Sequence, residues 1–535
     1  MSDQQRCQGR TRAGRPCRAL PVKGSDHCRQ HGRSDDGDQV VIGDKVSQAS
    51  ELVEMAREDY RFAVATTGEP FAVAREGPYL ARMLRGGSDS LRAELAAVYA
   101  DRQGRAPSSA ALADALLVLE GLAQREERWP LALRLARHEN GVVVDLGDEA
   151  GRALVVRPGE WHLSDYSPTV FRRTEATGAW PAPESGGDLD KLLRPLLNVT
   201  DEAWPLLVAW LVAAFLPEIP HPILALTGEQ GSAKSTATRR LVALTDPSPA
   251  PLRTVPRDVE QWVTAAAGSW VVALDNVSTI PAWLSDALCR AVTGDGFVKR
   301  RLYSDNALVV LSYRRVVILN GIDLGGLRGD LADRLLAVEL ERIRPEDRLD
   351  DADAQQAFED AWPAAFGALL DLVSDVLGIL PEIRVERPPR MADFARVVAA
   401  VDKLRGTTAL DTYRALVTRV QADVVDADPV ARAVRDLVDK RAEAWQGSAG
   451  ELLTQITPER PPRGWPETPQ GMAAALRRAA PPLRAAGVNV TYLGKGGGHA
   501  PSRGLDPREG PEPNVTNVTT SPRRPNPQVR RHGEW

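Results

Sequence analysis

Lysine is scarce in this chain: only eight of its 67 basic residues are lysines, and the rest are arginines. Between residues 192 and 402 only two occur, Lys234 and Lys299. A lysine kept in such a stretch fits a need for a compact ammonium group rather than a planar guanidinium. Lys234 is therefore a candidate functional residue.

Cysteine and long apolar runs are also scarce. Four cysteines in 535 residues exclude a disulfide scaffold. The longest apolar run, PLLVAWLVAAFL at 205–216, is too short to span a bilayer and predicts a buried helix. The polar start MSDQQRCQGR shows no targeting signal, so we expect a cytoplasmic chain, nucleoid-associated or in a phage replication complex, with no membrane contact. A net charge of −5 confines any nucleic-acid-binding surface to a local patch.

The length predicts several domains of about 150 residues each. Periodicity and composition predict a multidomain chain with an α/β P-loop core, flanked by helical domains, a small β meander and a C-terminal winged helix. The expected segments are a cysteine-bearing module (1–33), a polar linker (34–47), a helical domain (48–130), a β-rich domain (131–180), the α/β core (181–345), a helical domain (346–429), the winged helix (430–495) and a disordered tail (496–535).

The stretch PHPILALTGEQGSAKSTATRRLV, residues 220–242, has the frame of a phosphate-binding loop, G-x-x-x-x-G-K-[ST], with alanine where the second glycine is usual. An apolar strand precedes it and a helix can begin at Lys234. In such a loop, backbone N–H groups surround the phosphates, the lysine reaches the β- and γ-phosphates of ATP, and the hydroxyl binds Mg²⁺. The predicted nucleotide contacts are Gly228, Glu229, Gln230, Gly231, Ser232, Ala233, Lys234, Ser235 and Thr236.

Three further motifs follow in the order that a P-loop motor requires. WVVALDN is an apolar strand that ends in Asp275 and Asn276, where an acid would hold Mg²⁺. VVILN ends in Asn320, which could orient the attacking water. LRGDLADRLLAVEL offers Arg328 and Arg334 to the γ-phosphate of a neighbouring subunit. Each motif alone is weak, but their order and spacing together point to one site.

The loop, VVALDN, VVILNG and DLADRLL together resemble the AAA+ ATPases of the superfamily 3 helicase type, which include primase-helicases of phages and mobile elements. The resemblance covers roughly residues 190–345. It implies that Lys234 and Ser235 bind nucleotide and Mg²⁺, that Asp275 is the Walker B acid and that Asn320 is the sensor. It also implies a ring, expected to be a hexamer, in which Arg334 is the first and Arg328 the second candidate arginine finger.

Two positions depart from the usual pattern. Ala233 has a parallel in the minichromosome maintenance helicases, and alanine suits a helical backbone but not a positive φ, so we expect Ala233 to be helical. Asn276 stands where many family members have a second carboxylate. An asparagine can position water but cannot accept its proton. Either another carboxylate, such as Glu229, takes that role, or hydrolysis is slow.

The segment GDGFVKRRLYSDNALVVLSYRR predicts a β-hairpin with a turn at SDN. In the superfamily 3 type, a hairpin at this point grips nucleic acid in the channel of the ring. The resemblance therefore nominates Lys299, Arg300 and Arg301 as phosphate contacts. The alternative is an ordinary hairpin with a solvated basic face.

The N-terminal segment RCQGRTRAGRPCRALPVKGSDHCRQH supplies four potential zinc ligands, Cys7, Cys17, Cys28 and His31. Three thiolates and one imidazole complete a tetrahedral site, and a segment with so few apolar residues would fold only with metal. It resembles small zinc-binding modules at the ends of phage and bacterial proteins. His27 could replace His31, and three free thiols remain the alternative. The segment carries a local charge of about +6, which favours a polyanionic partner.

Near the C-terminus, GSAGELL and ETPQGMAAALRRAAPPLRAAG predict capped helices, and VNVTYLGKGGGHAPSRG predicts a strand and a flexible loop. This order suggests a winged helix with Arg477, Arg478 and Lys495 as phosphate contacts. Plain helical packing is the alternative.

Two functions remain open at this point. The first is an ATP-driven motor on single-stranded or forked DNA, a helicase of phage or mobile-element replication. Because no carboxylate cluster marks a primase site before residue 180, priming would need a separate primase or initiator. The second is a nucleotide-gated DNA-binding switch or scaffold, which Asn276 favours.

Overall fold

The computed structural model describes residues 47–86, 90–294, 296–300, 308–312, 314–321, 327, 329–344, 346, 348, 350–441, 445–492 and 518–520. For residues 296–300, 308–312, 485 and 518–520 it describes the backbone alone. The chain forms two compact units. One consists of residues up to Glu58 together with Arg92–Gly121, and the other holds the rest.

The first unit is helical in its described part. It contains most of α1 (Gln48–Asp59), α2 (Leu91–Gln103) and α3 (Ser109–Ala123). The buried Tyr99 of α2 receives a hydrogen bond from Gln48 Nε2 at 3.2 Å and donates one to Glu51 at 2.8 Å. Gln48 Oε1 also accepts the backbone N–H of Ser108 just before α3, so α1 connects the two later helices.

The prediction that residues 48–130 are helical throughout is wrong for the middle of that range. Three strands follow α1: β1 (Tyr60–Ala65), β2 (Pro70–Ala74) and β3 (Ala81–Met83). With β4 (Arg128–Trp129) they form a sheet in the order β3-β2-β1-β4. Aromatic and valine residues occur at every second position in YRFAVA and PFAVA, and Gly68 turns the chain at φ +88°. Such runs favour a hairpin.

The β-rich domain predicted at 131–180 contains the expected meander. Strands β5 (Leu135–His138), β6 (Gly141–Asp145), β7 (Ala153–Arg157) and β8 (Glu160–Ser164) pair antiparallel in sequence order. After the meander, Phe171 forms isolated bridges to Leu80 and Ala132. The chain then passes α4 (Leu189–Leu192) and the short 3₁₀ helix η1 (Arg194–Leu196) into the α/β core.

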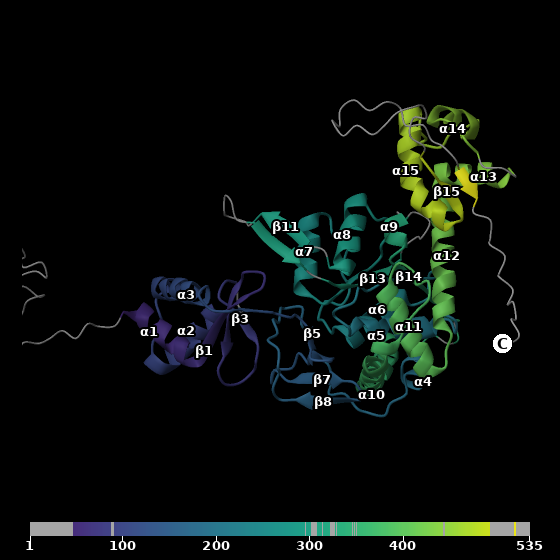
Figure 1. Ribbon diagram of the computed structural model, residues 1–535. Helices are drawn as coiled ribbons and strands as arrows, with labels where there is room; N and C mark the ends of the chain where they lie inside the picture. The colour runs from purple at the N-terminus through teal and green to yellow at the C-terminus, as the bar shows by residue number, and fades with distance from the viewer. Residues whose placement is uncertain are drawn as a thin grey trace, which may run out of the picture. The chain divides into compact units, whose positions relative to one another are not determined.

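The core is a four-stranded, all-parallel sheet in the order β10-β13-β9-β14. Figure 1 labels its strands β13 and β14. Its strands are β9 (Ile223–Thr227), β10 (Val271–Leu274), β13 (Val316–Asn320) and β14 (Leu335–Glu339), and the helices of the core are α5 (Trp204–Ala214), α6 (Lys234–Thr245), α7 (Val259–Gly268), α8 (Ala282–Thr293) and the four-residue α9 (Gly329–Ala332). Nearly every strand residue is buried, as expected for a parallel sheet covered on both faces.

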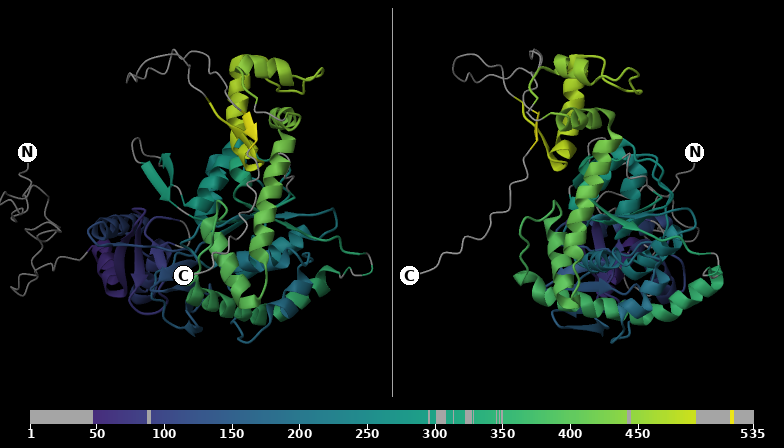
Figure 2. Two further views of the ribbon diagram at one scale, coloured as in Figure 1. Left: turned by 45° about the vertical axis from the view of Figure 1, so that its right-hand side comes forward. Right: turned by 90° about the vertical axis from the view of Figure 1, so that its right-hand side faces the viewer.

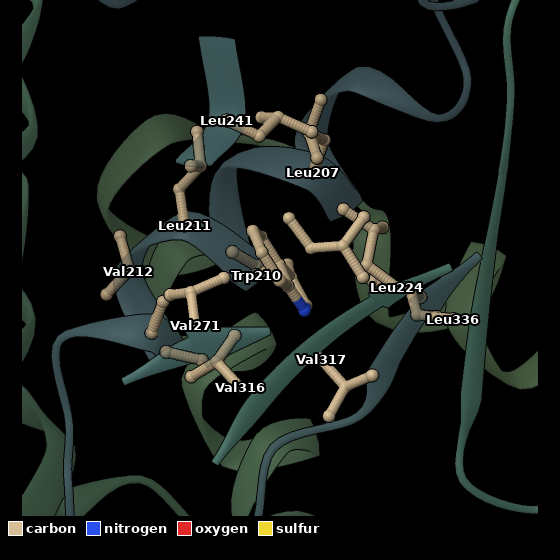
Figure 3. Packing of buried hydrophobic residues seen from close by; sticks show 14 of the residues in the cluster. Leu207, Trp210, Leu211, Val212, Leu224, Leu241, Val271, Val316, Val317 and Leu336 are labelled. Atoms are coloured by element: carbon tan, nitrogen blue, oxygen red, sulfur yellow. The ribbon is translucent and has the colours of Figure 1, made fainter. Parts of the chain in front are cut away.

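Helix α5 is apolar on all sides because it lies inside the protein. Its residues Leu207, Trp210 and Leu211 pack with Leu224 of β9 and Val271 of β10 (Figure 3). The indole of Trp210 donates to the carbonyl of Pro222 at 3.0 Å, which satisfies its one polar group. The apolar run at 205–216 is thus the core helix that its length predicted.

The segment predicted to be helical at 346–429 consists of α10 (Asp351–Ile379), the 3₁₀ helix η4 (Leu380–Glu382), α11 (Ala392–Arg405) and α12 (Ala409–Ala427). By length and composition alone, α10 with η4 could cross a membrane, but 56% of its most apolar window is buried inside the protein. A buried core helix can be as long and as apolar as a helix that crosses a membrane.

The C-terminal part contains α13 (Pro429–Asp439), α14 (Ala449–Ile456), α15 (Pro469–Ala485) and β15 (Val488–Val490). The capping box between Ser448 and Glu451 and the Thr468 cap with Pro469 are present as the sequence predicted. Strand β16 (Val518–Thr520) pairs antiparallel with β15, so the segment predicted as a disordered tail supplies one strand. Helix α12 contacts both α5 and α15 and leads from the core to this part (Figure 2). The hairpin formed by β11 (Gly296–Arg300) and β12 (Leu308–Ser312), also as predicted, lies between α8 and β13.

Candidate nucleotide-binding site

The loop between β9 and α6 has the strand–loop–helix context that the motif predicts. Lys234 is the first residue of α6, and its ammonium group turns back into the loop. It donates to the carbonyl oxygens of Gly228 and Glu229, both at 2.8 Å. The fully buried Ser232 also donates to the Glu229 carbonyl, at 2.9 Å. These bonds hold the loop closed around the lysine.

Ala233 does not have the helical backbone that we expected. It lies in the left-handed region at φ 56° and ψ 33°, as the residue just before α6. Helix α6 begins at Lys234, as predicted, but the residue before it is not helical. A glycine is usual at this position because a side chain makes a positive φ costly. The alanine is therefore accommodated at an energetic cost, and not because the site is helical.

Ser235, Asp275 and Asn320 come from three different elements and meet at one point. The Ser235 hydroxyl of α6 donates to the Asp275 carboxylate at 3.1 Å. Asn320 Nδ2, at the end of β13, donates to the same carboxylate and lies 3.3 Å from Ser235 Oγ. The three residues come together because β13 lies between β9 and β10 in the sheet. Since the three strands are parallel, their carboxyl ends lie side by side.

These residues line a cavity of about 720 Å³. Of the predicted contacts, Glu229 alone is not part of the lining, which consists of Thr227, Gly228, Gln230, Gly231, Ser232, Ala233, Lys234, Ser235, Thr236, Asp275, Asn276, Asn320 and Gly321. Sequence reasoning missed Thr227, Gly321 and Thr238, whose hydroxyl lies 3.4 Å from Asn320 Nδ2. Thr238 follows Lys234 by one helical turn, and this spacing could have indicated that the two side chains lie on the same face of α6.

Asn276 and Glu229, the two residues considered for activating water, have different positions. Asn276 is exposed, lines the cavity and has φ 54°. The exposed Glu229 carboxylate instead lies 4.0 Å from Arg342. Asp275 is therefore the one carboxylate among the described residues that line the cavity. The suggestion that Glu229 replaces the missing second carboxylate is not supported by its position.

Arg334 lies at the amino end of the strands, opposite the end that carries the loop. Its carbonyl accepts the N–H of Ile223, the first residue of β9, whereas the loop follows the last residue of that strand. Five residues of strand span about 16 Å. Its Nη1 donates to the carbonyl of Asp330 at 2.6 Å, and its Nε is buried without a hydrogen-bond partner among the described residues. Arg334 is thus remote from the cavity of its own chain.

Several predicted site residues lie outside the described part of the structure: Cys7, Cys17, Cys28, His31, Arg301, Arg328 and Lys495. Lys299 and Arg300 lie on β11, of which only the backbone is described. Arg477 and Arg478 are exposed on α15. Within the described ranges, no group of three or more His, Cys, Asp or Glu residues is arranged to hold a metal ion.

Comparison with known protein families gives two matches. One model, the actinomycete integrative conjugative element replication protein, matches residues 189–423, and the C-terminal domain of the same replication protein matches residues 430–506. Both models describe a replication protein of a mobile genetic element, and this chain is similar to them over the matched residues. The model over residues 189–423 takes in every residue that lines the cavity described above.

Solved structures give weaker similarities. The A form apo structure of the NrS-1 C-terminal region, residues 305–718, has a TM-score of 0.36 at 11% identity and covers 88% of this chain and 98% of that one. The SCCmec type IV Cch structure, described as an active helicase, has a TM-score of 0.40 at 10% identity and covers 86% and 93%. No curated protein matches the chain. Similarities at this level say nothing about the activity of this chain.

Proposed function

We propose that the chain is an ATP-binding and ATP-hydrolysing motor that acts on DNA during replication of a mobile element. The observation that carries this proposal is the convergence of Lys234, Ser235, Asp275 and Asn320 on one cavity that follows a parallel strand and precedes a helix. The match to a replication-protein family over residues 189–423 supports the DNA-directed role.

The groups in the cavity have complementary roles toward a nucleoside triphosphate. The loop N–H groups and the start of α6 favour phosphate oxygens. The ammonium group of Lys234 already lies within the loop. It can therefore exchange its hydrogen bonds to two loop carbonyls for bonds to the β- and γ-phosphates. Asn320 fixes the Asp275 carboxylate and can direct its remaining polar atoms at water.

Mg²⁺ fits the donor set at this point, since Ser235 and Asp275 present oxygen atoms within hydrogen-bond distance of each other. Mg²⁺ would neutralise the phosphate charge that develops during transfer. For Zn²⁺ we propose the N-terminal ligands Cys7, Cys17, Cys28 and His31, whose three thiolates and one imidazole suit a structural site.

The wider assembly follows from the position of Arg334. An arginine at the amino ends of the strands can reach only the nucleotide of a neighbouring subunit. We therefore infer a homo-oligomeric ring, for which a hexamer is the working model. Single-stranded or forked DNA would pass the β11–β12 hairpin and contact Lys299, Arg300 and Arg301. A separate primase or initiator would supply primers and loading.

A nucleotide-gated DNA-binding switch is the second candidate function. It is favoured by one observation: Asp275 is the one described carboxylate that lines the cavity, and exposed Asn276 occupies the position of a second. A site of this kind could bind ATP tightly and turn it over slowly.

The decisive experiment measures ATP turnover with and without single-stranded DNA, together with strand displacement. Wild type should show DNA-stimulated turnover, and Lys234→Ala should lower it about 10²-fold or more, because the group that stabilises phosphate charge is lost. Arg239→Ala, on an exposed position of α6, is the control and should keep wild-type turnover. ATP-dependent change in DNA affinity without turnover would establish the switch instead.

A further inference from the structure

A second cavity, of about 570 Å³, lies where α9, the α12–α13 junction and α15 meet. Two features of its lining stand out. Arg477 and Arg478 of α15 line one wall, and Gly329 and Asp330 of α9 line another, with apolar and proline side chains between them. The cavity thus lies between the C-terminal part of the chain and α9, the short helix that precedes Arg334.

The two arginines are available for a ligand. Both are exposed, and neither forms a hydrogen bond or an ion pair with any residue that the structure describes. Two guanidinium groups that line one cavity and have no ion-pair partner among the described residues attract an anion that offers several oxygen atoms, and phosphate is the anion they suit best.

The two carboxylates in the lining already have partners. Asp330 Oδ1 accepts a hydrogen bond from Arg390 Nη1 at 3.3 Å. Asp428 Oδ1 accepts the backbone N–H groups of Val430 and Ala431, at 2.9 and 3.0 Å, as the cap of α13. Both carboxylates are therefore engaged within the protein, whereas Arg477 and Arg478 form no hydrogen bond or ion pair with a described residue.

Helix α9 connects this cavity to the candidate arginine finger. A side chain at Gly329 would place its Cβ 3.4 Å from Pro482 Cδ, so α9 and α15 are in contact. The carbonyl of Asp330 accepts Arg334 Nη1 at 2.6 Å. Arg390 also donates to Asp333 at 3.0 Å, and Gln421 of α12 donates to the other oxygen of Asp333 at 2.6 Å. The turn that carries Arg334 is thus held between α9 and α12.

We propose that this cavity binds phosphate groups of a nucleic-acid backbone through Arg477 and Arg478, and that occupancy steadies α9 and the Arg334 turn. The binding step stands by itself, whereas its meaning for catalysis rests on the proposed function. The C-terminal part would then be both a DNA contact and a means of reporting bound DNA to the finger.

The binding step is tested by the affinity of the full chain for a fluorescent single-stranded oligonucleotide over a series of salt concentrations. Arg477→Glu with Arg478→Glu should weaken binding at least tenfold and reduce the salt slope by about 1.4, for two lost contacts. Arg460→Glu with Arg463→Glu is the matched control: the same change on exposed residues before α15 that do not line the cavity. Equal losses in the two double variants would overturn the proposal.

Inorganic phosphate serves as the second arm. Competition by phosphate for the oligonucleotide in wild type but not in the Arg477/Arg478 variant supports the shared site. A loss of phosphate binding in that variant, with its DNA affinity unchanged, would assign the cavity to a small anion and overturn the nucleic-acid assignment.

The link to Arg334 is tested by amide hydrogen exchange across residues 329–340, which needs no ATP turnover. DNA should slow exchange there in wild type and leave it unchanged in the Arg477/Arg478 variant at saturating DNA. Gln421→Leu removes the hydrogen bond from α12 to Asp333 without changing the cavity lining, so it should keep DNA binding but lose the protection. Gln356→Leu, which removes an exposed hydrogen bond to Asp360 on α10, is the control. Unprotected residues 329–340 in DNA-bound wild type would refute the link, even if ATPase activity were present.

Discussion

At the residue scale, the candidate nucleotide site contains two of the four described non-glycine residues with positive φ, Ala233 and Asn276. Asparagine is among the residues that adopt the left-handed region most readily, whereas alanine is not. Asn276 thus has a conformational reason for its identity, which a carboxylate of the glutamate type would lack. Strain of this kind persists only where the surrounding structure enforces it.

Replacing Ala233 by glycine should stabilise the protein by about 1 kcal/mol and leave nucleotide affinity unchanged or higher, because the Cβ strain at φ 56° disappears. Urea unfolding and titration with a fluorescent ATP analogue measure the two effects. The same substitution at Ala237, inside α6, is the control and should destabilise by about 1 kcal/mol, since glycine is a poor helix former. Effects of equal sign at the two positions would argue against strain at Ala233.

The buried His221 gives the core a specific pH dependence. Its Nε2 lies 3.0 Å from the carbonyl of Ala213, and burial, with a smaller effect of Arg314, lowers its pKa from 6.5 to about 4. The unfolded chain therefore takes up a proton near pH 6.5, whereas the folded chain does so only near pH 4. The stability that neutral His221 provides is complete above pH 6.5 and is lost as the pH falls toward 4, by about 3 kcal/mol in all.

We therefore expect His221→Gln to flatten the dependence of unfolding free energy on pH between 6.5 and 4, even if it lowers stability at pH 7. Denaturant titrations at half-unit steps of pH on the wild type and the variant measure this. A wild-type slope retained by the variant would show that other groups cause the acid sensitivity.

At the element scale, the sequence predicted the parts that local patterns encode. The loop, the two apolar strands ending in Asp275 and Asn320, the hairpin and the capped helix at Ser448 all follow from short motifs, and the structure contains each of them. The strands at 60–83 were missed because α1 continues into β1 without a break. The positive φ of Ala233 could have been inferred from the glycine that is usual at this motif position, whereas the alanine itself gives no such signal.

Long-range pairing was equally invisible in the sequence. Arg134, just before β5, donates to Asp246 at 2.8 Å and lies 4.4 Å above the ring of Trp180. Asp246 ends α6, and its other oxygen accepts the N–H groups of Trp270 and Val271 at the start of β10. One buried ion pair therefore joins the β meander to the helix and the strand that carry the nucleotide site.

Removing one partner of this pair should be costly. Arg134→Met leaves Asp246 buried without its counter-charge, so we expect a loss of roughly 3–5 kcal/mol in unfolding free energy. Arg137→Met is the control, because the Arg137–Glu218 pair is 58% and 53% exposed and should contribute about 0–1 kcal/mol. Urea unfolding followed by tryptophan fluorescence compares the two. Similar losses of unfolding free energy in both variants would show that the buried Arg134–Asp246 pair contributes no more than an exposed ion pair.

At the scale of the whole molecule, the proposed mechanism requires more than one chain. Arg334 lies at the amino end of β14, and the nucleotide loop follows the carboxyl end of the neighbouring β9. In the proposed ring, the phosphate site and the finger of one chain would therefore face different neighbours. Every complete site in a ring would combine Lys234 from one subunit with Arg334 from the next.

Mixing two inactive variants tests this arrangement. Lys234→Ala removes the phosphate contact but keeps the finger, and Arg334→Ala does the reverse, so each alone should lose ATP turnover by about 10²-fold or more. When the two are mixed in equal amounts and allowed to exchange subunits, interfaces that pair an intact Lys234 with an intact Arg334 form again. Turnover should then recover to a substantial fraction of wild type, with a maximum near equal proportions. A double variant carrying both substitutions, mixed with either single variant, should restore nothing. If the Lys234→Ala and Arg334→Ala mixture stays inactive while subunit exchange is confirmed by fluorescence energy transfer, Arg334 does not act across the subunit boundary.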